Sequence, residues 1–371
     1  MIPLWVAEMD VPLAPAISDR LRRAIDAGDT GYPTGTALGE AFAGFAARRW
    51  AWDDVEVART AVVPDVMHGL FATVTALTRP GDAVVVNPPV YTPFYSYTEH
   101  HGRRIIEAPL GSDLRLDLSA LEEAFVEATA RGAAAVFLLC NPHNPTGTVH
   151  TRDELAAVLD LADRYGVRLV SDEIHAPLTL PGARFTPLLS VDGAQRSIVA
   201  TSASKAWNLA GLKAGLLVAG SDAGEDLARI PGWLSRGASH LGVLAHTAAF
   251  TDGEEWLDRL IVGLDANRDL LGRLIGEHLP QVGWQQPEAT FLAWLDCVGL
   301  HGLHGVQAAV AAGTGFSDLT GAARLFYDRA QVALSPGETF GPGGEHHVRL
   351  NFAASQDVLI RAVTAMGEAA R

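Results

Sequence analysis

Lys205 is the residue of this chain whose surroundings most suggest covalent chemistry. It lies in the stretch TSASKAWNLAGLK, directly after an apolar run that reads as a buried strand. Partial burial lowers the pKa of a lysine, so that its free amine can attack a carbonyl carbon. The neighbouring hydroxyls of Ser202 and Ser204, with the cation of Lys213, could bind a phosphate. The alternative is an ordinary serine-rich loop with two exposed lysines.

Two other polar segments also follow apolar runs that read as strands. Asp172, in the sequence SDEIH, could hold a proton on a pyridine nitrogen, or it could simply be a helix N-cap or a loop acid. His175 in the same segment, taken alone, is more often a hydrogen-bonded core histidine than a catalytic one. Asn144, in NPHNPTG, could present an amide to a ligand oxygen, although this loop is also a turn before a helix.

An aromatic residue, a helix start and an arginine complete the candidates. Tyr91, held between prolines in PPVYTPFY, could offer a flat face to a ring, with core packing as the alternative. The stretch PDVMHG opens a helix whose free N–H groups could take a phosphate, although its Asp65 is also a candidate N-cap. Arg349, between apolar neighbours in VRLNF, needs a carboxylate or phosphate partner, which could be a substrate or a structural acid.

Composition narrows the class of protein. The 371 residues are 48% hydrophobic and 19% charged, which favours a folded chain with a sizeable core, and the net charge of −15 argues against a nucleic-acid or anionic-membrane surface. Two cysteines exclude a disulfide scaffold and a cysteine-rich zinc site, and no metal is expected. The longest apolar run, eight residues over 133–140, is far below the roughly 18 needed to cross a bilayer. With no export signal visible, we expect a cytoplasmic protein.

Short apolar runs alternate with amphipathic helices from about residue 60 onward. Thr151 and Glu154 form a capping-box signature, and Gly166 is expected to end that helix. Near-continuous apolar strands separated by helices predict a mostly parallel seven-stranded sheet covered by helices, with ligands at the carboxyl ends of the strands. The predicted strands are Ala61–Val63, Ala83–Asn87, Arg104–Glu107, Ala134–Leu139, Arg168–Ser171, Ser197–Thr201 and Leu216–Ala219.

The two ends of the chain have a different pattern. A helix is predicted at 14–27, and a long helix at 256–279 precedes an α+β arrangement. There we expect strands at 291–295, 332–334 and 347–351 and helices at 317–329 and 356–370. We therefore predict a large domain over 28–255, a smaller α+β domain formed by 1–27 and 280–371, and a linking helix over 256–279.

The motifs together, in this order, resemble the fold-type I pyridoxal-phosphate enzymes, the aspartate aminotransferase superfamily. Finer features are similar to the MalY/PatB-type cystathionine β-lyases, also called cysteine-S-conjugate β-lyases. These features are PLWVAEMD at 3–10, GYP at 31–33, VYTPF at 90–94, NPHNPTG at 141–147, DEIH at 172–175 and SKAWNLAGL at 204–212. The chain departs from that pattern at Glu8, Val11, His175 and Lys213, which bears on substrate range more than on cofactor binding.

The resemblance implies pyridoxal 5'-phosphate as the cofactor and assigns roles to these residues. Lys205 would form the Schiff base, Asp172 would pair with the pyridinium, and Tyr91 would stack on the ring. Arg349 would bind the substrate carboxylate, near Asn144 at the ring hydroxyl oxygen. The further cofactor contacts would come from the backbone of Val66 and Met67 and from Ser202, Ser204, His175 and Lys213. Tyr32 would reach the site of the neighbouring subunit, touching phosphate and substrate there, which implies a homodimer.

The implied activity is cleavage of the C–S bond of cystathionine or a related cysteine S-conjugate, an amino-acid thioether, to a thiol, pyruvate and ammonia. A class I/II aminotransferase on the same scaffold is the leading alternative, because it shares the steps up to removal of the α-proton. A regulatory or binding protein that kept the fold and lost the chemistry is a third reading. Retention of Lys205, Asp172 and Arg349 together argues against that third reading.

Overall fold

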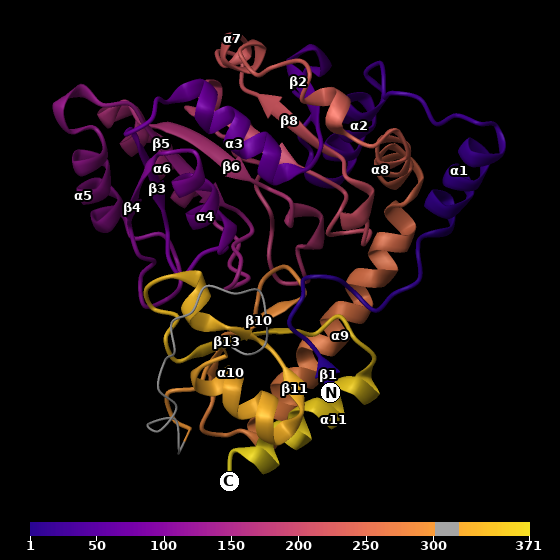
Figure 1. The fold of residues 1–371 in the computed structure, drawn as a ribbon, viewed down its shortest axis with the longest axis vertical. Helices are drawn as coiled ribbons and strands as arrows, with labels where there is room; N and C mark the ends of the chain where they lie inside the picture. The colour runs from indigo at the N-terminus through magenta and orange to yellow at the C-terminus, as the bar shows by residue number, and fades with distance from the viewer. Residues whose placement is uncertain (301–318) are drawn as a thin grey trace.

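A seven-stranded sheet organises the larger part of the molecule (Figure 1). The computed structural model describes residues 1–300 and 319–371. The strand order is β2-β8-β7-β6-β5-β3-β4; β8 is antiparallel to β2 and β7, and the other neighbours are parallel. The predicted mostly parallel sheet is therefore confirmed. Its strands are β2 (Thr60–Val63), β3 (Ala83–Val86), β4 (Arg104–Glu107), β5 (Ala135–Cys140), β6 (Arg168–Asp172), β7 (Ile198–Thr201) and β8 (Gly215–Ala219).

Helices cover both faces of this sheet because its central strands are apolar on both sides. All six residues of β5 are buried. One face packs against α5 (Leu118–Ala128) and α6 (Arg152–Tyr165). The other face packs against α3 (Val66–Leu77), α4 (Pro93–His100) and α7 (Gly224–Ala228). The carboxyl ends of the parallel strands thus remain the open edge of the sheet.

The predicted capping box begins α6. Thr151 Oγ1 accepts a hydrogen bond from the N–H of Glu154, and Glu154 Oε2 accepts from the N–H of Thr151 at 2.7 Å. Gly166 ends the helix in the left-handed conformation, with φ of 69°. Each expected signal for this helix is confirmed.

A four-stranded sheet organises the smaller part. Its order is β12-β13-β10-β9, antiparallel throughout, and β1 separately pairs with β11. Here the predicted helix at 317–329 lies partly outside the described residues, and its described portion is a short α-helix that continues as a π-helix over Phe326–Ala330. The elements are β1 (Ile2–Pro3), β9 (Gly283–Trp284), β10 (Leu292–Asp296), α10 (Gly321–Leu325), β11 (Val332–Ala333), β12 (Ser335–Pro336), β13 (His347–Asn351) and α11 (Gln356–Ala369).

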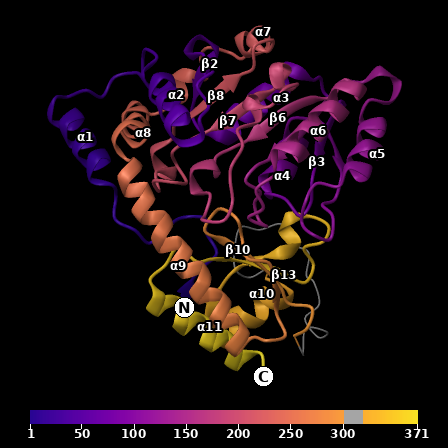
Figure 2. The same ribbon diagram turned by 180° about the vertical axis from the view of Figure 1, so that it is seen from behind.

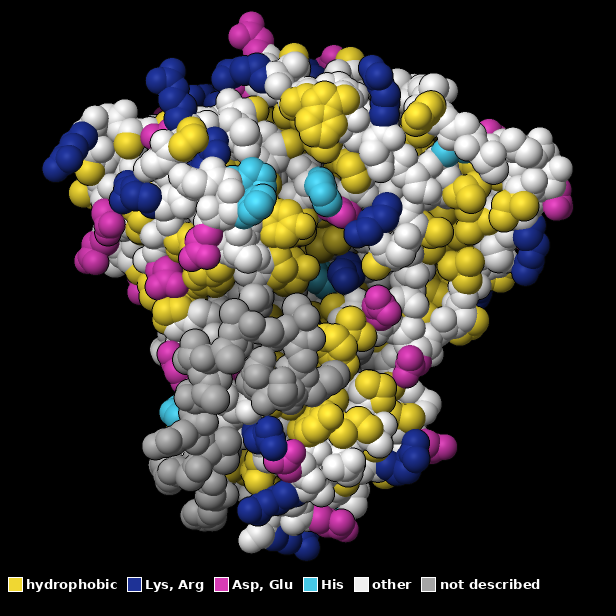
Figure 3. All heavy atoms as spheres, viewed as in Figure 1, with side chains coloured by type: hydrophobic (Ala, Val, Ile, Leu, Met, Phe, Trp, Pro, Cys, Tyr) yellow, Lys and Arg dark blue, Asp and Glu magenta, His cyan; other side chains and the backbone are white. Residues whose placement is uncertain are grey.

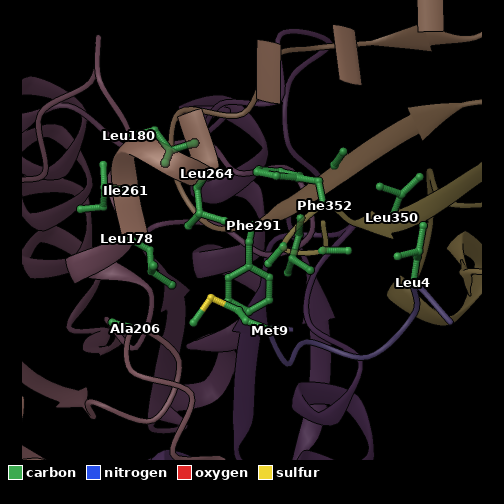
Figure 4. Close-up of a cluster of buried hydrophobic side chains, with 14 of the residues drawn as sticks. Leu4, Met9, Leu178, Leu180, Ala206, Ile261, Leu264, Phe291, Leu350 and Phe352 are labelled. Atoms are coloured by element: carbon green, nitrogen blue, oxygen red, sulfur yellow. The ribbon is translucent and has the colours of Figure 1, made fainter. Parts of the chain in front are cut away.

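The long helix α9 (Glu254–His278) runs from the seven-stranded sheet to the smaller part, as the two opposite views show (Figures 1 and 2). Its apolar side joins a core that also contains residues of both chain ends (Figure 4). In that close-up Ile261 and Leu264 of α9 lie near Phe291 and Met9. Three further helices pack into this core: α1 (Pro15–Asp26), α2 (Ala37–Trp50) and α8 (His240–Asp252).

In the part of the chain that the structure describes, no helix is both long enough and apolar enough to cross a membrane.

Candidate active site

Lys205 lies in the turn that follows β7. Its side chain is half-buried, and Nζ donates a hydrogen bond to the carbonyl oxygen of Ala7 at 2.9 Å. Burial, followed by the nearby cation of Arg349, lowers the pKa of Lys205 to about 8. A lysine in this state has a substantial free-amine fraction near neutral pH, which nucleophilic attack requires.

Hydrogen bonds of Ser202 stabilise the turn that carries Lys205. Ser202 Oγ donates to the carbonyl of Ala214 at 2.8 Å and accepts from the N–H of Ser204 at 3.0 Å. It also lies 2.9 Å from Nε2 of His246, a buried histidine of α8 whose pKa burial lowers to about 4. The Ser202 hydroxyl is thus already engaged within the chain, so its contact with a phosphate stays a prediction.

Asp172 ends β6 at the open edge of the sheet, in register with Cys140 on one side and Ala200 on the other. Its side chain is buried, and Oδ1 accepts from the N–H of Ile174 at 3.0 Å. Burial raises the pKa of Asp172 to about 7, against the lowering effects of that hydrogen bond and of the Lys205 charge. A buried carboxyl of this kind is stabilised in its charged form by a cation placed beside it.

Arg349 projects from β13 toward this edge. Its Nη1 donates to Asn144 Oδ1 at 3.0 Å, and Nη2 donates to the carbonyl of Trp5 at 3.0 Å and to Ser335 Oγ at 3.2 Å. Its guanidinium carbon lies 5.0 Å from the ring centroid of Phe340. Burial lowers the pKa of Arg349 to about 10, and its Nε has no hydrogen-bond partner among the described residues. The structure shows no carboxylate paired with Arg349 in the described part of the chain, so the structural-acid alternative gains no support.

Tyr91 and His175 lie beside the same charges. Burial raises the pKa of Tyr91 to about 12, with the Asp172 carboxylate adding to the rise and the Arg349 cation opposing it. Burial, and then the Lys205 and Arg349 cations, lower the pKa of His175 to about 3. His175 Nδ1 is buried with no hydrogen-bond partner among the described residues. The structure thus brings Tyr91 near the aspartate and the arginine, and His175 near the lysine and the arginine.

The start of α3 lies at the same side of the sheet. Asp65 is its N-cap and accepts from the N–H of His68 at 2.9 Å, which leaves the N–H groups of Val66 and Met67 without an intrahelical partner. Lys213 Nζ lies 3.2 Å from Asp65 Oδ2. The alternative reading of Asp65 as a helix N-cap is therefore confirmed. A phosphate bound at this helix start would have to share the Lys213 cation with the Asp65 carboxylate.

Tyr32 is separate from the other predicted residues. Its side chain is 77% exposed, in the loop before α2. The described chain therefore offers Tyr32 to the outside, and its role in a neighbouring subunit's site stays a prediction. Between the larger and smaller parts the surface is hollowed, and a basic side chain and a histidine are visible inside the hollow (Figure 3).

Four residues at the site were not assigned a role from the sequence. Phe340 lies against the Arg349 guanidinium, and Ser335 hydrogen bonds to it. Asn208 and Asn351 bind the backbone of residues 6–9. The sequence could have pointed to the two asparagines as site residues, because each lies within three residues of Lys205 or Arg349. It could not have shown what they bind, because residues 6–9 are far away in the sequence.

The residues fit pyridoxal 5'-phosphate. Among the described residues no cation hydrogen bonds to the buried Asp172 carboxyl and no group hydrogen bonds to Nδ1 of His175, so both polar groups are available to a ligand. Lys205 supplies an amine of lowered pKa, and the start of α3 supplies backbone N–H groups for an anion. Each is a group that a protonated pyridine ring carrying an aldehyde and a phosphate would require.

Comparisons with known proteins identify the family of this chain. A protein of Mycobacterium tuberculosis with the provisional name cystathionine beta-lyase is 56% identical over 370 residues, covering 99% of this chain and 91% of that protein. Cystathionine beta-lyase PatB of Bacillus subtilis is 35% identical over 364 residues, covering 95% and 88%. Cystalysin of Treponema denticola, whose crystal structure contains a pyridoxal 5'-phosphate cofactor, superposes with a TM-score of 0.88 at 26% identity, covering 100% and 91%. The model of the family Aminotransferase class I and II matches residues 6–366, and the chain belongs to this family.

Proposed function

We propose that this protein is a pyridoxal-phosphate-dependent C–S β-lyase that cleaves cystathionine or a related cysteine S-conjugate. The observation that carries the proposal is the convergence of a lysine of lowered pKa, a buried aspartate and a buried arginine at one edge of the sheet. The names of its relatives from Mycobacterium tuberculosis and Bacillus subtilis support a substrate with a C–S bond.

Each step of the proposed reaction is assigned to particular residues of this chain. Arg349 binds the substrate carboxylate through its planar fork, and Asn144 fixes one arm of that fork. The Lys205 amine removes the α-proton, and the resulting ammonium returns a proton to the sulfur that leaves the β-carbon. Asp172 holds the proton on the pyridine nitrogen, while Tyr91 covers the ring. When bound, pyridoxal 5'-phosphate supplies the electron sink that accepts the charge left by the α-proton.

The balance of the reaction follows from these steps. The bond between sulfur and the β-carbon breaks, and sulfur leaves as a thiol. The remaining three-carbon unit takes up water and yields pyruvate and ammonia. No oxidant or second amino acceptor is needed.

Incubation of the pyridoxal-phosphate-loaded protein with L-cystathionine, without any added 2-oxo acid, tests this proposal. We expect stoichiometric pyruvate and thiol, and no product with Lys205→Ala. Strict dependence on an added 2-oxo acid would instead favour the aminotransferase. A protein that stays colourless after addition of pyridoxal 5'-phosphate would favour the binding-protein reading.

The proposal extends to assembly, domains and location. The exposed Tyr32 is available to a second copy, which supports a homodimer in which it completes the neighbouring site.

Helix α9, which links the two sheets, supports a large domain over 28–255 and a small one over 1–27 and 280–371. The two cysteines are both buried and unpaired, as a reducing cytoplasm would allow.

A further inference from the structure

The segment Trp5–Met9, which we name the strap, is held against the candidate site through its backbone. All five of its carbonyl oxygens accept a hydrogen bond from a side chain. Lys205 binds the carbonyl of Ala7, and Arg349 binds that of Trp5. A segment without regular secondary structure is thus fixed by side chains from distant parts of the chain.

Ser335 Oγ also donates to the carbonyl of Trp5, at 2.7 Å, and two asparagines bind the other three carbonyls. Asn351 Nδ2 donates to the carbonyl of Val6 at 2.8 Å and to that of Glu8 at 2.5 Å. Asn208 Nδ2 donates to the carbonyl of Met9 at 2.9 Å, and its Oδ1 accepts from the N–H of Met9 at 3.0 Å. Both amides are therefore oriented by the strap itself, with Nδ2 as the donor.

The side chains that bind the strap differ in what the proposed function, on which this inference rests, demands of them. Lys205 must give its nitrogen to the cofactor, and Arg349 must turn its fork to a substrate carboxylate. Both then compete with the strap carbonyls of Ala7 and Trp5. Asn208 and Asn351 carry no such duty, so their bonds can persist while substrate is bound.

We propose that Asn208 and Asn351 are positioning residues that keep the strap in place as the wall of the substrate site when Lys205 and Arg349 release it. Their places in the chain suit this role. Asn208 lies three residues after Lys205, with φ of +58°, and Asn351 lies two residues after Arg349 on the same face of β13. The strap is thus tied both to the turn that carries the lysine and to the strand that carries the arginine.

Two variants remove these bonds with little other change. Asn351→Asp keeps the oxygen that accepts from the N–H of Ala353 at 2.8 Å but replaces the donor with an oxygen that repels two carbonyls. Asn208→Gly removes the side chain and tolerates the positive φ. A matched control is Asn267→Asp, because Asn267 of α9 also donates to two backbone carbonyls, those of Phe352 and Ala354, and neither belongs to the strap.

The experiment has two readouts on the pyridoxal-phosphate-loaded protein. Hydrogen exchange of the Met9 amide and the other strap amides, measured without substrate, should accelerate about tenfold or more in Asn351→Asp and Asn208→Gly. The KM for L-cystathionine should rise by about tenfold with a smaller change in kcat. In Asn267→Asp both quantities should stay at the wild-type values. Thermal unfolding of all three variants identifies any loss of global stability.

Wild-type exchange of the strap amides in both variants would overturn the proposal, as would equal changes in Asn267→Asp. A higher exchange rate with an unchanged KM would overturn it too, because the strap would then not line the substrate site. Failure of the proposed function looks different: the wild-type protein itself would not turn over cystathionine. In that case the exchange measurement still decides whether the asparagines hold the strap.

Discussion

Arg349 and Asn144 are joined directly: Nη1 of the arginine donates to Oδ1 of the asparagine at 3.0 Å, although 205 residues separate them in the sequence. The resemblance places one at the substrate carboxylate and the other at the ring oxygen of the cofactor. The contact connects the smaller sheet to the loop after β5. A change in either residue should therefore affect how substrate and cofactor are held together.

Replacement of Arg349 tests the role of its fork. Arg349→Lys keeps a positive charge but loses the paired donors, and we expect the KM for L-cystathionine to rise by at least tenfold, corresponding to about 1.4 kcal/mol or more. Arg349→Ala should raise it further. An inhibitor that carries an amide in place of the carboxylate should bind the wild type and Arg349→Lys equally. Unchanged KM values in both variants would contradict carboxylate binding by Arg349.

The pKa of Lys205, lowered to about 8 by burial and then by Arg349, predicts a pH dependence of cofactor loading. The free amine is the reactive form, so the rate at which the cofactor-free protein develops its imine absorbance should rise as the pH increases through about 8. Arg349→Leu removes one cause of the lowering and should move this midpoint upward. A midpoint near the ordinary lysine value of about 10.4 would rule out the proposed setting.

Asp172 predicts a pH-dependent stability of the cofactor-free protein. Because its pKa is raised in the folded state to about 7, its contribution to stability is present at low pH and is lost as the pH rises through 7. Asn at this position cannot ionise. The unfolding temperature of Asp172→Asn, relative to the wild type, should therefore rise between pH 5 and pH 8. A difference that stays constant over this range would show that Asp172 is already ionised at pH 5.

Subunit complementation tests the proposed role of the exposed Tyr32. Tyr32→Ala and Lys205→Ala should each be nearly inactive as pure dimers. If Tyr32 serves the neighbouring site, a mixed dimer contains one site with both residues intact, so a refolded equimolar mixture should recover about a quarter of the wild-type activity. A mixture as inactive as its components would place Tyr32 in its own subunit's site or outside both.

Alanine substitutions at two glycines of α9, Gly253 at its N-cap and Gly263 in its interior, should have opposite effects on stability. A Cβ at Gly253 would lie 2.6 Å from the carbonyl oxygen of Ala249 and 2.6 Å from Nε1 of Trp207. We therefore expect Gly253→Ala to lower the free energy of unfolding by about 1–3 kcal/mol. Gly263, within the same helix, has no neighbouring atom within 4 Å of such a Cβ, and Gly263→Ala should stabilise the protein by about 0.5–1 kcal/mol. Denaturant unfolding curves measure both, and destabilisation by Gly263→Ala would contradict the reasoning.

The large sheet could be predicted from sequence because its central strands are buried on both faces and its strands are separated by turn residues. Predicted and observed bounds of these seven strands differ by at most one residue at either end. Helix α8 was not predicted because it is apolar on most sides and shows no amphipathic stripe. The two-residue strands β1 and β9 are too short to carry an alternating pattern, so only their tertiary partners define them.

Site prediction relied on a residue's type and its place at a strand end, as for Lys205 and Asp172, and the roles of these residues stay predictions. It could not reveal that Ser202 already hydrogen bonds to Ala214 and His246, because the three come from separate elements. The strap was invisible for the same reason: Asn351 lies 345 residues from Val6. Local patterns do not encode contacts across such separations.

The strap also constrains the order of events during synthesis. Residues 2–10 leave the ribosome long before their backbone partners, which include residues 331, 333 and 353. The nascent chain can complete its seven-stranded sheet, with Lys205 and Asn208 available to the strap, before residues 331, 333 and 353 have been made. The candidate site can therefore be completed only after residue 353 has been made, and a chain terminated before residue 331 would carry the lysine and the aspartate without Arg349 or the backbone partners of this segment.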